Sequence, residues 1–208
     1  MPARHQTTPA ATNAAAADAD AAVAGRGHTL FETAIGTCGI AWGPGGIVAV
    51  QLPEADADGT RARLLRGLSP FYAEPSEPPP AVRSAIEGIQ ALLTGQPRDL
   101  SDVPLDMSRV STFHQQVYAI TRAIGPGQTR TYGEVAEQIG HKGLSRAVGQ
   151  ALGLNPFAPV VPCHRILGAK GQTGGFSAGG GAATKMRMLE IEGALAHETL
   201  ALFAPRDE

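Results

Sequence analysis

The sequence predicts an α/β amino-terminal part followed by a mainly α-helical carboxy-terminal part that contains a helix-turn-helix. Three observations lead to this fold class. Short apolar runs between Gly and Pro residues fill 29–52, which is typical of an antiparallel meander. Apolar residues then recur at helical spacing in 58–68 and 80–94. In the second half of the chain, two helical stretches are separated by a short turn that contains glycine.

Composition divides the 208 residues into four segments. Residues 1–27 are rich in Ala and Thr, have almost no large apolar side chains and lack the apolar run of a signal peptide, so we expect a disordered tail. Residues 28–107 form the α/β part and 108–193 the helical part, with a boundary in the Pro- and Asp-containing stretch 95–107. Residues 194–208 form a second tail. No apolar run approaches transmembrane length.

The α/β part is predicted to hold three strands, at 29–34, 38–42 and 47–52, because turn-forming glycines separate them. Cys38 lies within the second strand, and we expect it to be a core residue, since an isolated cysteine usually behaves as a small buried hydrophobe. A Pro-rich link, 70–80, joins the two predicted helices.

The helical part is predicted to begin with a helix that Thr112 caps. Thr131 and Glu134 have the spacing of a capping box and start a second helix. A turn at 140–144 leads to a third helix, 146–154, with Ser145 as its cap. Beyond these come a hairpin or wing at 167–175, a Gly-rich loop at 177–181 and a closing helix at 182–193.

The charges are distributed unevenly along the chain. Residues 28–107 carry five Lys/Arg and ten Asp/Glu, a net charge of −5, whereas 108–193 carry nine Lys/Arg and four Glu, a net charge of +5. A helix-turn-helix within a basic segment indicates DNA as a partner. The alternative is a simple scatter of solvated charges.

The candidate for chemistry is the thiol in the segment 159–166. Val160 and Val161 favour a short buried strand that Pro162 ends, which would place Cys163 at the edge of the core. A nearby imidazole can generate the reactive thiolate, but neighbours in a strand point to opposite faces, so His164 would act through a turn or a bridging water. Glu192 is a candidate to orient the imidazole.

The residues around this thiol resemble one known family. Pro162-Cys163-His164-Arg165, Asn155-Pro156 before it, Ser145 to Gly149 further upstream, and Lys185 and Glu192-Gly193 after it are similar to methylated-DNA–protein-cysteine S-methyltransferases, also called O6-alkylguanine-DNA alkyltransferases. The similarity is dense over 112–193 and looser over 33–52.

This resemblance implies a ribonuclease-H-like subdomain and a winged helix-turn-helix domain. It implies an enzyme that acts once, moving an alkyl group from guanine O6, or less efficiently from thymine O4, irreversibly to Cys163. The partner would be double-stranded DNA with alkylated bases. We expect the protein to use no cofactor, to bind no metal and not to associate with a membrane. We expect a monomer, and the two distant cysteines suggest a reducing compartment, the cytoplasm.

The resemblance also implies roles for single residues. Cys163 accepts the alkyl group, His164 takes its proton, Glu192 holds the imidazole, Asn155 holds the turn, and Tyr132 helps to rotate the nucleotide and protonates the leaving guanine. Arg146 fills the place of the flipped base. The DNA-binding set is Arg146, Tyr132, Thr131, Ala147, Gly149 and Arg165. The substrate pocket set is Val160, Pro162, Phe176 and Ser177.

Two features depart from the family pattern. Phe176 stands where many members have Tyr, and the loop at 179–181 is longer than in close relatives. Two other functions fit part of the sequence. A protein that recognises alkylated bases without chemistry would lack the cysteine, which is present here. An unrelated thiol hydrolase with a Cys-His pair would leave the helix-turn-helix and the charge asymmetry unexplained.

Overall fold

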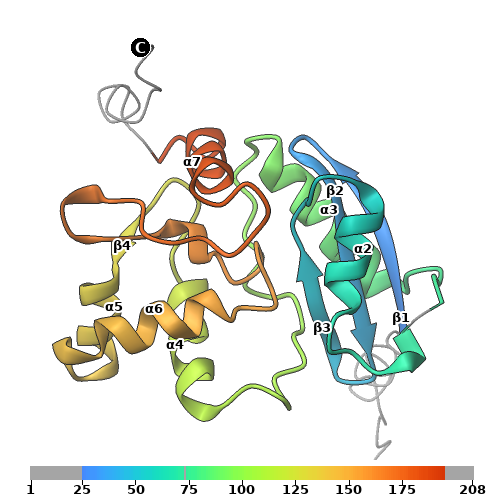
Figure 1. The fold of residues 1–208 in the computed structure, drawn as a ribbon, viewed down its shortest axis with the longest axis horizontal. Helices are drawn as coiled ribbons and strands as arrows, with labels where there is room; N and C mark the ends of the chain where they lie inside the picture. Colours follow the sequence, from blue (N-terminus) through green and yellow to red (C-terminus); the bar gives the residue numbers. More distant parts are fainter. Residues whose placement is uncertain (1–24, 73, 195–208) are drawn as a thin grey trace, which may run out of the picture.

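A computed structural model describes residues 25–72 and 74–194 (Figure 1). Residues 1–24 of the first predicted tail and 195–208 of the second lie outside the described residues. Within the described part, an α/β half and a largely helical half lie side by side (Figure 1). The predicted division into an α/β part followed by a helical part is therefore correct at this coarse level.

The sheet of the α/β half is a three-stranded antiparallel meander. It consists of β1 (Gly27–Thr33), β2 (Gly36–Gly43) and β3 (Gly46–Gln51), in the order β1-β2-β3. Gly36 and Gly46 start β2 and β3 with φ values of +122° and +113°, a region that side chains disfavour. The three predicted strands are thus confirmed, with bounds that differ from the predicted ones by one or two residues at each end.

Helices cover both faces of this sheet, with α2 (Ala57–Leu65) in front of it and α3 (Pro80–Leu93) behind it in Figure 1. Because side chains alternate along a strand, the middle strand β2 is buried on both sides. Cys38 is fully buried in the larger core cluster, as expected for a core cysteine. Beneath α2 lies a smaller cluster of Ala41, Ala49, Leu64 and Tyr72.

The helical half contains α4 (Thr112–Arg122), α5 (Tyr132–Ile139), α6 (Ser145–Gly153) and α7 (Ala182–Ile191). The capping box of α5 is present, since Thr131 accepts from the Glu134 amide and the Glu134 carboxylate accepts from the Thr131 amide. Two predicted caps are wrong. Ser111, not Thr112, caps α4, and Ser145 is the first residue of α6, which has no side-chain cap.

The backbone around the cysteine also differs from expectation. Val160 and Val161 are buried but form a turn, not a strand, because Asn155 and Phe157 bond to the backbone of Val161. After the cysteine, β5 (Ile166–Leu167) pairs in parallel with β4 (Arg130–Thr131). The stretch 168–175 then forms a loop with a 3-10 turn at Ala169–Gly171 in place of the predicted hairpin.

Backbone hydrogen bonds occupy the outer edges of the sheet. On β3, the Ile47 amide donates to the Pro104 carbonyl (2.9 Å) and the Val50 amide to the Pro156 carbonyl (2.7 Å). On β1, the Ser76 amide donates to the His28 carbonyl (2.9 Å), next to a bridge between His28 and Pro75. The Pro156 contact joins the sheet directly to the segment that leads to the cysteine, so the two halves share one hydrophobic core.

Candidate active site

The thiol sits on a tight turn that one asparagine braces. Cys163 begins the 3-10 turn Cys163–Arg165. The Asn155 side chain donates from Nδ2 to the Val161 carbonyl (2.8 Å) and accepts at Oδ1 from the Phe157 amide (3.0 Å). These bonds fix the backbone on the amino-terminal side of Cys163, which is 7% exposed.

The imidazole next to the thiol is oriented from the end of α7. His164 is fully buried, and its Nε2 lies 2.9 Å from Oε1 of Glu192. An ionised carboxylate only accepts hydrogen bonds, so Nε2 must carry the proton and Nδ1 of the neutral ring keeps its lone pair. Within the part of the chain that the structure describes, this buried Nδ1 has no hydrogen-bond partner. His164 is therefore held as a base with a free acceptor nitrogen.

Arg165 completes the buried network and is not a surface cation. Its Nε and Nη2 each lie 2.8 Å from an oxygen of Glu192, and its Nη1 donates to the Ile124 carbonyl. The residue is only 5% exposed. The assignment of Arg165 to the DNA-binding set is corrected accordingly, because a guanidinium that Glu192 holds inside the protein cannot reach a phosphate.

The charges of this network follow from burial and hydrogen bonding. Burial raises the pKa of Glu192, but the hydrogen bonds from His164 and Arg165 outweigh it and lower the pKa to about 2. Burial lowers the pKa of His164 despite the opposing effect of Glu192, so the ring is neutral at pH 7. Burial also raises the pKa of the Cys163 thiol, while Asn155 and Lys185 act in the opposite direction.

Lys185 is a residue of the site for which the sequence predicted no role. It is fully buried on the inner side of α7, where its Nζ donates to the Ile166 carbonyl (2.5 Å) and lies 5.8 Å from the centre of the Tyr132 ring. Burial lowers its pKa to about 8, against the effect of Cys163. The helical spacing of the closing helix already indicated that Lys185 is buried, because it places Lys185 on the same face as the apolar residues Met188 and Leu189.

The predicted DNA-binding residues gather on α5 and α6. Tyr132, Arg146 and Gly149 line one cavity of about 640 Å³ together with Cys163, and Arg146 is exposed. Gly149 faces the Tyr132 ring, which a Cβ at this position would contact at 3.7 Å. Ala147 is half-buried on α6. The Thr131 hydroxyl is engaged in the α5 capping box, which limits it as a DNA contact.

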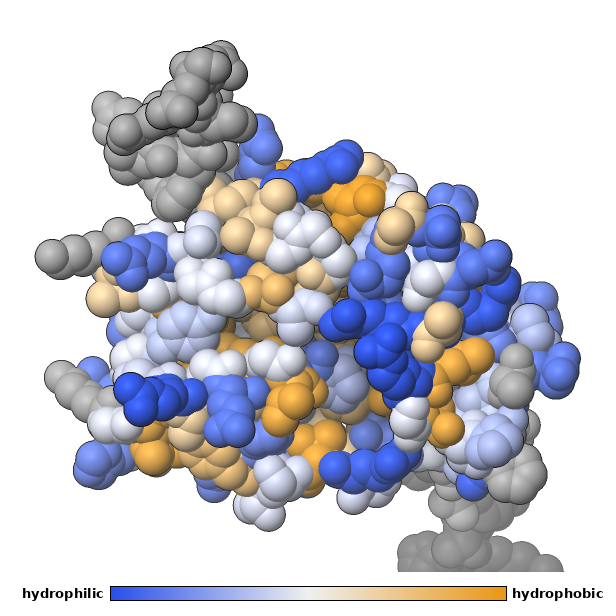
Figure 2. All heavy atoms as spheres, in the orientation of Figure 1, coloured by the Kyte–Doolittle hydropathy of each residue, from blue (hydrophilic) through white to orange (hydrophobic). Residues whose placement is uncertain are grey.

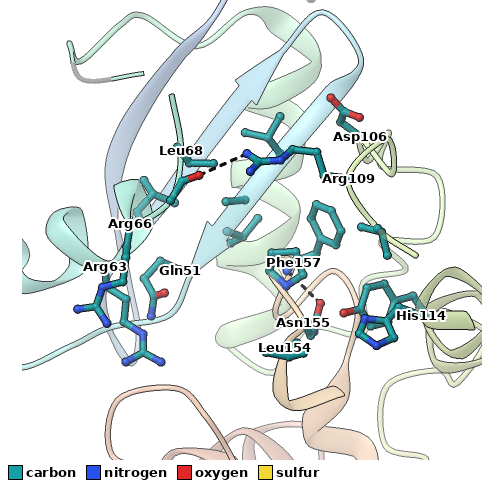
Figure 3. Close-up of a pocket in the computed structure, with 18 of the residues that line it drawn as sticks. Gln51, Arg63, Arg66, Leu68, Asp106, Arg109, His114, Leu154, Asn155 and Phe157 are labelled. Carbon is teal, nitrogen blue, oxygen red and sulfur yellow. Dashed lines mark hydrogen bonds between the residues drawn. The ribbon is translucent and has the colours of Figure 1, made fainter. Parts of the chain in front are cut away.

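A second, smaller cavity of about 150 Å³ reaches Cys163 from the side of the α/β half. Phe176 and Ser177 line both cavities next to the thiol. Val160 and Pro162 are buried and are not among the residues that line these two cavities, so their place in the substrate pocket stays a prediction. Asn155 and Leu154 line both this smaller cavity and a third one, of about 660 Å³, to which residues of α2 and α4 contribute (Figure 3).

The network around Glu192 predicts a specific loss of stability in acid. The pKa of this carboxyl is lowered in the folded protein, so its contribution is full above the ordinary value of 4.5 and disappears as the pH falls toward 2. The contribution is on the order of 3 kcal/mol. We expect urea unfolding of Glu192→Gln to show a lower stability at pH 7 and a shallower decline between pH 4.5 and 2.5 than the parent protein.

The matched control is Glu87→Gln, which alters an exposed carboxylate on α3. Its pH profile should follow that of the parent. An unchanged profile for Glu192→Gln would contradict the assigned ion pair.

The described ranges, 25–72 and 74–194, show neither a metal site nor a membrane span. They contain no group of three or more His, Cys, Asp or Glu side chains arranged to hold a metal ion. They also contain no helix with the length and apolar character needed to cross a membrane.

Comparison with known proteins connects this geometry to one family. A family model for the DNA-binding domain of 6-O-methylguanine DNA methyltransferase matches residues 112–194. A methylated-DNA–protein-cysteine methyltransferase of Mycobacterium bovis is 42% identical over 144 residues, 67% of this chain and 84% of the relative. One from Methanothermobacter thermautotrophicus is 34% identical over 155 residues, 74% of this chain and 78% of the relative.

The solved structures agree with the sequence comparison. The structure of Mycobacterium tuberculosis OGT in complex with DNA superposes with a TM-score of 0.65 at 34% identity. The match covers 85% of this chain and 99% of that chain, so it extends well beyond residues 112–194.

Proposed function

Because this chain belongs to the methylated-DNA–protein-cysteine methyltransferase family, we propose that it repairs DNA by moving an alkyl group from guanine O6 to the sulfur of Cys163. The observation that carries this function is the buried chain of contacts from the thiol turn through His164 to the ionised Glu192. Alkylated thymine O4 is the proposed weaker substrate. Each molecule acts once, since the thioether that forms is not reversed.

The reaction needs a thiolate, and the site provides a route for the proton. The Nδ1 lone pair of His164 accepts the Cys163 proton through a bridging water, and Glu192 stabilises the imidazolium that forms. The Lys185 ammonium favours the negative sulfur. In the transfer itself, the sulfur forms a bond to the alkyl carbon as that carbon's bond to O6 breaks. The electron pair leaves with the guanine, to which Tyr132 gives a proton.

The target atom lies inside a duplex, so the nucleotide must leave the base stack. We propose that α5 and α6 belong to a winged helix-turn-helix unit at 108–193, with Arg146 inserted into the vacated stack. Gly149 and Ala147 let the α6 backbone approach the groove. Residues 28–107 would be the ribonuclease-H-like subdomain. We further propose that the protein works as a monomer in the cytoplasm.

One experiment tests the function. The protein is incubated with duplex DNA that contains O6-methylguanine radiolabelled in the methyl group, and the label is then mapped by digestion. We expect up to one equivalent of label per protein, all on the peptide with Cys163. Tight binding without label would favour a recognition protein, and more than one equivalent of demethylated DNA would contradict the single-turnover mechanism.

A further inference from the structure

We propose that Arg63 of α2 is a specificity-determining residue. It holds in place the loop at 176–178, which forms one wall of the smaller cavity beside the Cys163 thiol, and so limits the size of the alkyl group that the site accepts. This inference rests on the proposed function and deepens it. The residue lies in the α/β half, outside the segment that carries the thiol and the predicted DNA-binding residues.

Arg63 connects the two halves at the cavity itself. Its Nη2 donates to the Ser177 carbonyl at 2.6 Å, and its Nε lies 3.2 Å from Oε1 of Glu54. Gln51 donates to the same Glu54 oxygen at 3.1 Å. Glu54, itself held by Gln51, therefore orients the Arg63 guanidinium. The guanidinium in turn binds the Ser177 carbonyl oxygen in the loop that lines the cavity. Figure 3 shows Arg63 beside Gln51 at one end of the neighbouring larger cavity.

A second contact holds the same loop two residues later. The Gly179 backbone lies so close to the connection between β3 and α2 that a Cβ there would be 2.4 Å from the Pro53 carbonyl oxygen and 3.0 Å from a Glu54 carboxylate oxygen. Thr184 of α7 donates to the Gly179 carbonyl at 2.6 Å. The loop at 177–179 is thus seated on the α/β half, and Arg63 fixes the end of it nearest to the thiol.

The position of this loop decides how much space lies beside the sulfur. The cavity of about 150 Å³ is lined by Leu52, Gln51 and Arg63 of the α/β half, by the loop at 176–178 and by Cys163. A methyl group needs no room beyond the sulfur, whereas a benzyl group must place its ring in the space next to it. A cavity of about this volume is only just large enough for a benzene ring, so a fixed wall selects against bulky groups.

Hydrophilic side chains lie at the surface over α2 (Figure 2). The Arg63 side chain is 37% exposed and that of Glu54 is 21% exposed. An ion pair of this exposure adds little to the stability of the fold. Its removal should consequently alter the pocket without unfolding the protein.

The test compares transfer from O6-methylguanine and from O6-benzylguanine placed in the same duplex, so that effects on DNA binding cancel in the ratio of rates. We expect Arg63→Met to raise the benzyl-to-methyl ratio about tenfold, the effect of ~1.4 kcal/mol on a barrier. Gly179→Ala should raise it too, because the added Cβ pushes the loop off Pro53. Arg63→Lys, which keeps a cationic donor, should return the ratio toward that of the parent.

The matched control is Arg61→Ala on the same helix, which removes only an exposed pair with Asp58 and should leave the ratio unchanged. Circular dichroism verifies that each variant is folded. A ratio that is unchanged or lowered in both Arg63→Met and Gly179→Ala overturns the inference, while failure of the parent protein to accept any methyl group would overturn the proposed function instead.

Discussion

Replacing Cys163 with serine is expected to abolish transfer of the label from O6-methylguanine to the protein. The substitution keeps the size of the side chain within its braced turn but exchanges a thiol for a hydroxyl. The hydroxyl is far less acidic, so the neutral His164 cannot generate the corresponding anion, and oxygen is the poorer nucleophile toward a saturated carbon. The measurement is label bound per protein after prolonged incubation, with a loss of at least about a thousandfold in rate.

Cys38 supplies the matched control for this prediction. It is fully buried between the sheet and α3, and burial raises the pKa of its thiol to about 12. Cys38→Ala should keep one equivalent of label, whereas Cys163→Ser should still bind the alkylated duplex. Label on Cys163→Ser protein, or its absence from Cys38→Ala protein that is folded, would exclude Cys163 as the acceptor.

Arg146→Ala is expected to slow repair of duplex DNA by about a hundredfold while reaction with free O6-benzylguanine changes less than about twofold. Removing a base from the stack costs a few kcal/mol, and the exposed Arg146 side chain is the group proposed to fill the gap. A free base has no stack to leave, so it does not need this residue. The two rates are measured by single-turnover labelling of Cys163.

Arg83→Ala is the comparison variant, since it removes an exposed arginine from α3, in the other half of the molecule. It should affect neither rate by more than about twofold. Equal losses on duplex and free base in Arg146→Ala would refute the stacking role and indicate a disturbed thiol site.

The sequence predicted those features that depend on local patterns. The short apolar runs between turn-forming glycines in 29–52 specified the meander, and the Thr131–Glu134 spacing specified the start of α5. The resemblance named Glu192 as the partner of His164, and the structure places the two side chains 2.9 Å apart. What failed locally was the strand at Val160–Val161, where hydrogen bonds to Asn155 and Phe157 override the preference of β-branched residues for strands.

The remaining features depend on contacts that no local pattern encodes. Arg165 looks like a surface cation in the sequence, yet Glu192 draws it into the interior from 27 residues away. The contact between Arg63 and Ser177 joins residues that are 114 positions apart, in different halves of the chain. From the sequence alone, charged residues such as these are expected to be solvated. Only the packing of the two halves determines which of them form hydrogen bonds inside the protein.

The proline-flanked contacts on both outer strands of the sheet also bear on self-association. A strand edge with unpaired amides and carbonyls is a template for another chain, and proteins protect such edges to avoid aggregation. Here the neighbours of β1 and β3 come from stretches with Pro75, Pro104 and Pro156. A proline has no amide to donate, so each of these stretches lacks one of the donors that pairing with a further strand would use. The Pro156 segment, which joins the sheet to the thiol-bearing half, thus also protects the β3 edge from pairing with another chain.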